Sequence, residues 1–181
     1  MIIGVTGTFG SGKSLVVKYL GKDVINVDKI GHQILEKKKK DIVKIFGKDI
    51  IRNKKVDRKK LGNIVFSDKI KLNKLNKIVH PEMVKSVKEK AKGNYVIDAA
   101  LLVQLNLDKL CDKIILVKSN KKIQTERLLN KGYSKTHINN VISEQNKQFK
   151  KLKPDLIIRN VKTKEELKKQ VKQWIKKQQL N

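Results

Sequence analysis

The sequence predicts an α/β fold in which helices cover both faces of a five-stranded parallel sheet. Short β-rich runs alternate with helical stretches along the chain, and this alternation is typical of parallel sheets. The first run leads through a glycine-rich loop into apolar residues at helical spacing, which is the order strand, loop, helix. The five predicted strands are Ile2–Thr6, Val24–Val27, Tyr95–Asp98, Lys113–Val117 and Asp155–Arg159.

The glycine-rich loop, GTFGSGKS, matches the phosphate-binding pattern G-x-x-x-x-G-K-[ST]. Its glycines can adopt backbone angles that are closed to other residues, so successive N–H groups can turn toward a phosphate at the positive end of the next helix. Lys13 is expected to reach the β- and γ-phosphates, and the Ser14 hydroxyl to bind Mg²⁺. We therefore predict ATP and Mg²⁺ as cofactors. The predicted nucleotide-binding residues are Gly7, Thr8, Phe9, Gly10, Ser11, Gly12, Lys13, Ser14 and Leu15.

The chain has 181 residues, and we expect it to form one domain. The longest stretch between predicted strands carries apolar residues at three- and four-residue spacing, which predicts an inserted helical substrate lobe at about residues 29–93. Within this lobe, Pro81 is expected to begin a helix. After the fourth strand, Ser119 and Ser134 are each expected to begin a helix. This polar helix pair, at about residues 119–149, is predicted to be a lid that opens and closes easily.

Two further signals mark helix ends near the C-terminus. Gly132 is expected to close the first lid helix. Thr163 and Glu166 form a capping box for a terminal helix that runs through Trp174.

The net charge of +27 also fits a nucleic-acid-binding protein, because clustered basic residues bind a phosphate backbone. Only four of the 44 basic residues are arginine, the lysines run along every predicted helix, and aromatic residues make up 4%. We therefore expect a solvated lysine-rich surface and no specific nucleic-acid partner, since base recognition favours arginine and strand binding needs aromatic platforms. A basic ATPase stimulated by nucleic acid stays open as an alternative.

Composition also bears on location. No apolar run is long enough to cross a bilayer, and Met1 leads directly into the first predicted strand without a basic and apolar leader. The single cysteine, Cys111, is expected to pack beside an apolar strand, which fits a reducing compartment. We expect a cytoplasmic protein with no membrane partner.

Two acidic residues end predicted strands at the edge of the sheet where ligands of open α/β folds collect. Asp98 ends the third strand, and Asp28 directly follows the second. Asp28 could accept a proton from an attacking hydroxyl or help to hold Mg²⁺, or it could simply cap a helix over residues 29–35. The guanine-reading pattern N-K-x-D is absent, which argues against a GTPase. A small-molecule kinase and a strand-borne ATPase both remain open at this point.

The chain also resembles a known family, the dephospho-coenzyme A kinases, over nearly its whole length. The segments that carry the resemblance are GVTGTFGSGKS, VINVDKIGHQIL, LGNIVFSDKIKLNKLNKIVHPEM, VIDAALLVQ, CDKIILVKSNKKIQTERLLNKG and DLIIRN. The most particular piece is LNKIVHP, residues 75–81. The resemblance implies a P-loop kinase fold and transfer of the ATP γ-phosphoryl group to the 3′-hydroxyl of dephospho-coenzyme A. We expect no obligate protein partner.

The same resemblance implies roles for individual residues. The catalytic group would be Lys13, Asp28 and Arg127, and the substrate would contact Asp28, Asn76, His80, Asp98 and Leu102. The chain departs from the family pattern at Asn26, Ala100, Gln104 and Lys131. These departures leave a second alternative, a catalytically weakened relative that binds nucleotides as a regulatory module.

Overall fold

The structure is a computed structural model that describes residues 1–179, apart from the side chains of Lys151 and Gln179. The chain divides into two compact units. Unit 1 consists of Met1–Asn26 and Ala91–Asn181, and unit 2 of Val27–Lys90.

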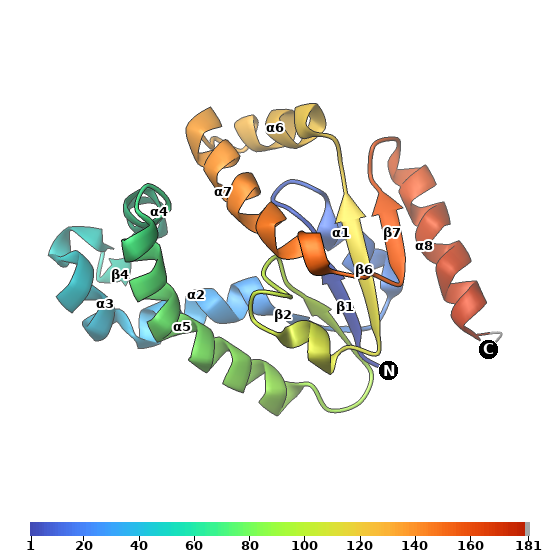
Figure 1. The fold of residues 1–181 in the computed structure, drawn as a ribbon, viewed down its shortest axis with the longest axis horizontal. Coiled ribbons are helices and arrows are strands. Elements are labelled where there is room, and N and C mark those ends of the chain that lie inside the picture. Colours follow the sequence, from blue (N-terminus) through green and yellow to red (C-terminus); the bar gives the residue numbers. More distant parts are fainter. Residues whose placement is uncertain (180–181) are drawn as a thin grey trace. The chain divides into compact units, whose positions relative to one another are not determined.

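Unit 1 is built on a five-stranded sheet in which every pair of neighbouring strands is parallel (Figure 1). The strand order is β2-β5-β1-β6-β7, so the first strand lies at the centre. The predicted fold class is confirmed, although Val27 belongs to a helix and not to the second strand. The strands are β1 (Ile3–Thr6), β2 (Asp23–Asn26), β5 (Tyr95–Asp98), β6 (Lys113–Lys118) and β7 (Leu156–Arg159).

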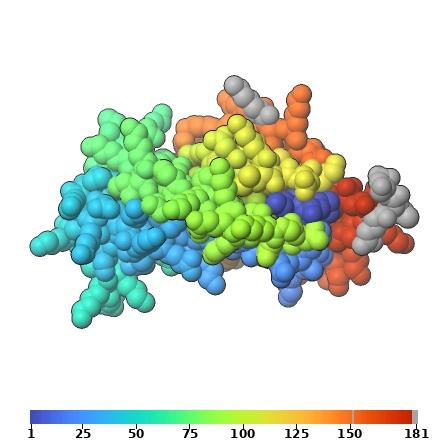
Figure 2. All heavy atoms as spheres, turned by 90° about the horizontal axis from the view of Figure 1, so that it is seen from below, coloured from blue at the N-terminus to red at the C-terminus, as the bar shows by residue number. Residues whose placement is uncertain are grey.

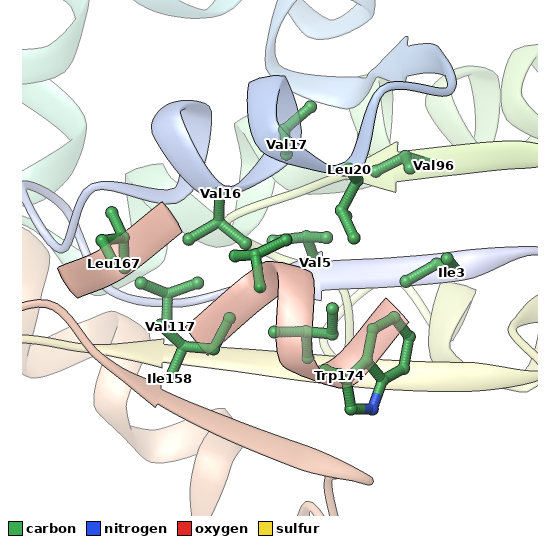
Figure 3. Close-up of a cluster of buried hydrophobic side chains, with 12 residues drawn as sticks. Ile3, Val5, Val16, Val17, Leu20, Val96, Val117, Ile158, Leu167 and Trp174 are labelled. Carbon is green, nitrogen blue, oxygen red and sulfur yellow. The ribbon is translucent and has the colours of Figure 1, made fainter. Parts of the chain in front are cut away.

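The main core of unit 1 lies between the sheet and helices α1 (Lys13–Leu20) and α8 (Lys164–Gln179). Figure 3 shows apolar side chains from the sheet and from these two helices pointing toward one another, with Trp174 of α8 at one end of the cluster. Alternate residues of the central strand, Ile3 and Val5, point into this cluster, as the period of two in a strand requires. Burial of each such side chain stabilises the fold by about 1.5–3 kcal/mol.

The opposite face of β1 packs on the segment that follows β5. A Cβ atom at Gly4 would meet Leu102 and Cys111, so only glycine allows this close approach. The Cys111 thiol donates to the Leu107 carbonyl of the short helix η2 (Leu107–Leu110), and burial raises its pKa to about 12. In Figure 2 the first residues, in dark blue, lie beside the yellow segment before β6, where the Asp112 N–H donates to the Ile2 carbonyl.

Two helices and a short turn connect β6 to β7: α6 (Lys121–Leu129), α7 (Lys135–Gln148) and η3 (Phe149–Lys151). The cap of α6 is Asn120, whose side chain accepts from the Ile123 N–H, so the prediction that Ser119 begins this helix was wrong by one residue. Ser119 Oγ instead donates to the carbonyl of Asn160, the residue directly after β7. Ser134 caps α7 as predicted. We call α6 and α7 together the lid.

Unit 2 is helical apart from one small hairpin. Its helices are α2 (Val27–Lys37), α3 (Lys39–Phe46), η1 (Lys48–Ile50), α4 (Arg58–Phe66) and α5 (Lys69–Lys90). The antiparallel strands β3 (Ile51–Arg52) and β4 (Lys55–Val56) were not predicted. Both residues of their two-residue turn, Asn53 and Lys54, have positive φ, as a type I′ hairpin turn requires.

Helix α5 is continuous through Pro81, so the prediction that this proline begins a helix was wrong. Proline removes one N–H donor from a helix interior. Packing compensates for that loss, since Val79, Met83 and Val87 of α5 are all buried. Met83 lies against Gly31 of α2. A Cβ atom at position 31 would be crowded by the sulfur and the terminal methyl group of Met83.

Candidate active site

The phosphate loop connects β1 to α1, and four of its carbonyl groups accept hydrogen bonds from protein donors. The Thr8 carbonyl accepts from the Ser11 N–H at 3.0 Å, and the Gly12 carbonyl accepts from the first turn of α1. Arg127 Nη1 donates to the Gly10 carbonyl at 3.3 Å. The Ser11 carbonyl accepts from Asn160 Nδ2 at 2.8 Å.

The N–H groups of the same loop are arranged differently. Within residues 1–179, the backbone N–H groups of Gly10, Gly12, Lys13 and Ser14 donate to no protein acceptor. Gly10 and Gly12 have φ values of 76° and 96°, a left-handed conformation that favours glycine. Free N–H groups at the start of a helix form an anion site, so the loop fits the phosphates of ATP.

The lid contacts the same loop from α6 and α7. Gln124 Nε2 donates to Thr8 Oγ1, and the Phe9 N–H donates to Gln145 Oε1 at 2.7 Å. The Phe9 ring packs against an apolar lid cluster of Leu128, Ile138 and Ile142. It also meets the Tyr133 ring edge-on, at a centroid distance of 4.9 Å. Loop residues 8–10 are therefore all in contact with the lid.

Asp98 lies at the carboxyl end of β5, beside the end of β2. It is 4% exposed, and its Oδ2 accepts from Asn26 Nδ2 at 3.1 Å. The two residues are register partners in the parallel ladder. A carboxylate at position 26 would face Asp98 across the strands, so the amide found there avoids a like-charge contact.

Unit 2 holds three of the predicted site residues. Asp28 is exposed in the first turn of α2, so the expectation that it directly follows a strand or caps a helix was wrong. The positive end of the helix dipole stabilises a carboxylate at this position. Asn76 and His80 are one turn apart on α5, which places them on one face. Burial lowers the pKa of the His80 imidazole, which favours the neutral ring.

Leu102 and Leu15 are placed differently from the other predicted contacts. Leu102 is fully buried against β1, and Leu15 packs at the edge of the core. Both positions fit packing, and a direct ligand contact by either residue stays a prediction.

Several polar residues at these sites were not found from the sequence. In unit 2, Arg58 Nη1 lies 2.8 Å and 2.9 Å from the two ring nitrogens of His32. Burial and the Arg58 charge lower the pKa of His32, while Asp28 opposes this effect. In unit 1, Gln145 and Asn160 bond directly to the phosphate loop. No local pattern marks these residues, because each acts on a segment far away in the sequence.

A cavity of about 340 Å³ lies between the lid and the end of β6, with Thr8 of the phosphate loop in its wall. Polar side chains including Ser119, Lys121 and Gln124 line it, and Phe149 supplies an apolar wall. Its size is within the lower range of small-molecule sites.

A magnesium ion would find few protein ligands here. Within the described part of the chain, no group of three His, Cys, Asp or Glu side chains could hold a metal ion. Ser14 places an exposed hydroxyl in the first turn of α1. This donor set fits Mg²⁺, which commonly binds through one or two protein groups together with substrate phosphates. No helix among the described residues is long and apolar enough to cross a membrane.

The parallel sheet and the phosphate loop with its free N–H groups define a P-loop nucleotide-binding fold. A family model described as dephospho-CoA kinase matches residues 1–166. The chain belongs to the dephospho-CoA kinase family, and it is an ATP-dependent phosphotransferase.

Individual relatives agree with this assignment. A dephospho-CoA kinase of Fusobacterium nucleatum is 39% identical over 186 aligned residues, which cover 96% of each chain. The solved dephospho-CoA kinase from Campylobacter jejuni has a TM-score of 0.59 at 25% identity and covers 97% of this chain and 96% of its own. A crystal structure from Thermus thermophilus has a TM-score of 0.77 at 23% identity, with coverage of 98% and 97%, and supports the fold.

Proposed function

We propose that this chain transfers the γ-phosphoryl group of ATP to the ribose 3′-hydroxyl of dephospho-coenzyme A, giving coenzyme A and ADP. The observation that carries this proposal is the family match over residues 1–166 in a chain whose phosphate loop keeps its N–H groups free. The proposed location is the cytoplasm. The proposed partner is the small-molecule acceptor alone, without nucleic acid or an obligate protein.

The phosphate loop and the lid would act on the transferred group. The free N–H groups of Gly10, Gly12, Lys13 and Ser14 would hold the β- and γ-phosphates, and the Lys13 ammonium would stabilise charge that develops during transfer. Arg127, which is already bonded to the loop, would add a second positive charge from the lid. Mg²⁺, held by Ser14 and the phosphates, would neutralise further charge.

A second set of residues would act on the acceptor. Asp28 carries an exposed carboxylate that would accept the proton of the 3′-hydroxyl as the oxygen attacks phosphorus. Asn76 and His80 would bind the acceptor, and the neutral His80 ring can both donate and accept a hydrogen bond. Asp98, held by Asn26, would orient groups at the sheet edge.

The test is an acceptor panel in which ADP release is measured with dephospho-coenzyme A, AMP and adenosine at equal concentrations. Dephospho-coenzyme A should be used fastest, because binding of its pantetheine arm would position the ribose. Faster phosphorylation of AMP or adenosine would make the chain a general nucleotide kinase. Hydrolysis that is stimulated by a polynucleotide, with no acceptor used, would favour the nucleic-acid alternative.

Three variants then test the residue roles in the same assay. Lys13→Ala should nearly abolish transfer with an unchanged circular dichroism spectrum. Asp28→Asn should lower kcat by roughly 10²-fold, with a smaller effect on ATP binding. His80→Ala should raise KM for the acceptor and leave KM for ATP nearly unchanged. Turnover like that of the wild type in the Lys13 variant would contradict the phosphate-loop assignment.

A further inference from the structure

Asn160 is a buried polar residue at the end of the last strand that has no role in the proposed chemistry. It directly follows β7 and is 5% exposed. Its backbone N–H donates to the Lys118 carbonyl and its carbonyl accepts from Ser119 Oγ, both at 2.8 Å. These two bonds fix its backbone to the end of β6, just before the lid begins.

The side chain of Asn160 reaches the phosphate loop, 149 residues earlier in the chain. Its Nδ2 donates to the Ser11 carbonyl at 2.8 Å in a buried position. The C=O and N–H groups of a trans peptide point in opposite directions. Holding the Ser11 carbonyl toward Asn160 therefore turns the Gly12 N–H away from it, toward the side where a phosphate would bind.

Gly12 and Asn160 approach each other so closely that a side chain is excluded. A Cβ atom at Gly12 would overlap Asn160 Nδ2 and would lie 3.7 Å from Arg127 Nη1. Arg127 holds the Gly10 carbonyl, and Asn160 holds the Ser11 carbonyl. The two side chains thus fix successive carbonyls of the loop.

We propose that Asn160 is a positioning residue for phosphoryl transfer. Its amide fixes the Ser11–Gly12 peptide so that the Gly12 N–H faces the nucleotide phosphates, and its backbone ties this orientation to the base of the lid. Without the amide donor, the Ser11 carbonyl loses its buried partner and the peptide plane can rotate. The loop then loses preorganisation for phosphate, whereas the acceptor-binding residues of unit 2 are untouched.

Two variants separate the donor from the shape of the side chain. Asn160→Ala removes the amide, and Asn160→Asp keeps its shape but replaces the donor by an oxygen that faces the Ser11 carbonyl. Each should raise the dissociation constant of ADP, measured by calorimetry, and KM for ATP by roughly tenfold or more. The Asp variant should be affected at least as strongly as the Ala variant. KM for dephospho-coenzyme A should change by less than about twofold.

The matched control is Asn94→Ala, because Asn94 is exposed and precedes the amino end of β5, whereas the phosphate loop follows the carboxyl end of the parallel strand β1. It should leave ADP binding unchanged. A purely structural role for Asn160 would lower the melting temperature of both variants while leaving ADP affinity like that of the wild type, and this result would overturn the proposal. An equal rise in KM for both substrates would overturn it as well. ADP binding is measured without acceptor, so the outcome does not depend on which acceptor the enzyme uses.

Discussion

At the scale of single residues, His80 couples the folded state to pH. Burial lowers its pKa below the ordinary value of about 6.5. The unfolded chain therefore binds a proton more readily than the folded chain. The stability that follows from the neutral ring is fully present above the ordinary pKa and is lost as pH falls through the lower, folded-state value.

The expected result is a melting temperature that falls between pH 7.5 and pH 5, and falls less steeply in His80→Gln. Glutamine keeps a polar side chain at this position but does not titrate. Some slope should remain in the variant, since burial also lowers the pKa of His32 and His137. Differential scanning fluorimetry across this pH range provides the measurement. Equal slopes in the wild type and the variant would contradict the prediction.

Residues differ in how far the sequence could place them. The loop residues from Gly7 to Ser14 were predictable because strand, loop and helix are consecutive in the chain. Asn160 was not, because its bond to Ser11 depends on strand order, which joins β7 to β1 through β6. The exact position of Asp28 was missed because α2 begins directly after β2, without a loop.

At the scale of elements, the lid is more firmly attached to the loop than its polar composition predicted. Phe9 of the phosphate loop packs against three buried apolar side chains, Leu128, Ile138 and Ile142. A hydrogen bond from the Phe9 N–H to Gln145 adds to this contact. Separating α6 and α7 from the loop would expose the cluster and break these bonds.

Phe9→Ala should lower the free energy of unfolding by about 1–3 kcal/mol, less than the 3–5 kcal/mol of a fully buried phenylalanine, because Phe9 is only partly buried. It should also raise KM for ATP, since the lid would no longer restrain the loop. Urea denaturation measures the first effect and steady-state kinetics the second. Leu129→Ala is the matched control, because Leu129 is exposed beside buried Leu128 and should cost less than about 0.5 kcal/mol. Equal losses in the two variants would rule out the packing role of Phe9.

Two elements of unit 2 show where local signals failed. Pro81 suggested a helix start, yet apolar packing by α5 outweighs the missing N–H donor. The hairpin of β3 and β4 has only two residues in each strand, too few for an alternating pattern to be visible. Helices α2, α3 and α4 were predictable, since their apolar spacing repeats over two or more turns.

At the scale of the whole molecule, the net charge of +27 should bear on stability. Few lysines of the described chain make ion pairs; examples are Lys38 with Glu82 and Lys113 with Asp155. The remaining positive charges repel one another in the folded state. Salt shortens the range of this repulsion, to about 10 Å at 0.1 M.

The melting temperature should therefore rise by a few degrees between 10 mM and 300 mM sodium chloride. Choline chloride should have the same effect, because screening does not depend on the identity of the ion. Scanning fluorimetry in both salts gives the measurement. A melting temperature that stays constant or falls would show that the lysines are already balanced within the fold.

Gly12 and Asn160 also limit how this chain can change by mutation. The space that a methyl group would take at position 12 is filled by the amide at position 160, so neither residue can be exchanged without regard to the other. Any side chain at position 12 displaces the amide, and a larger side chain at position 160 pushes on the loop. Substitutions at the two positions should be strongly epistatic. If the two residues change one at a time, the intermediate enzyme has a distorted loop. Other residue combinations at positions 12 and 160 are therefore hard to reach by single substitutions.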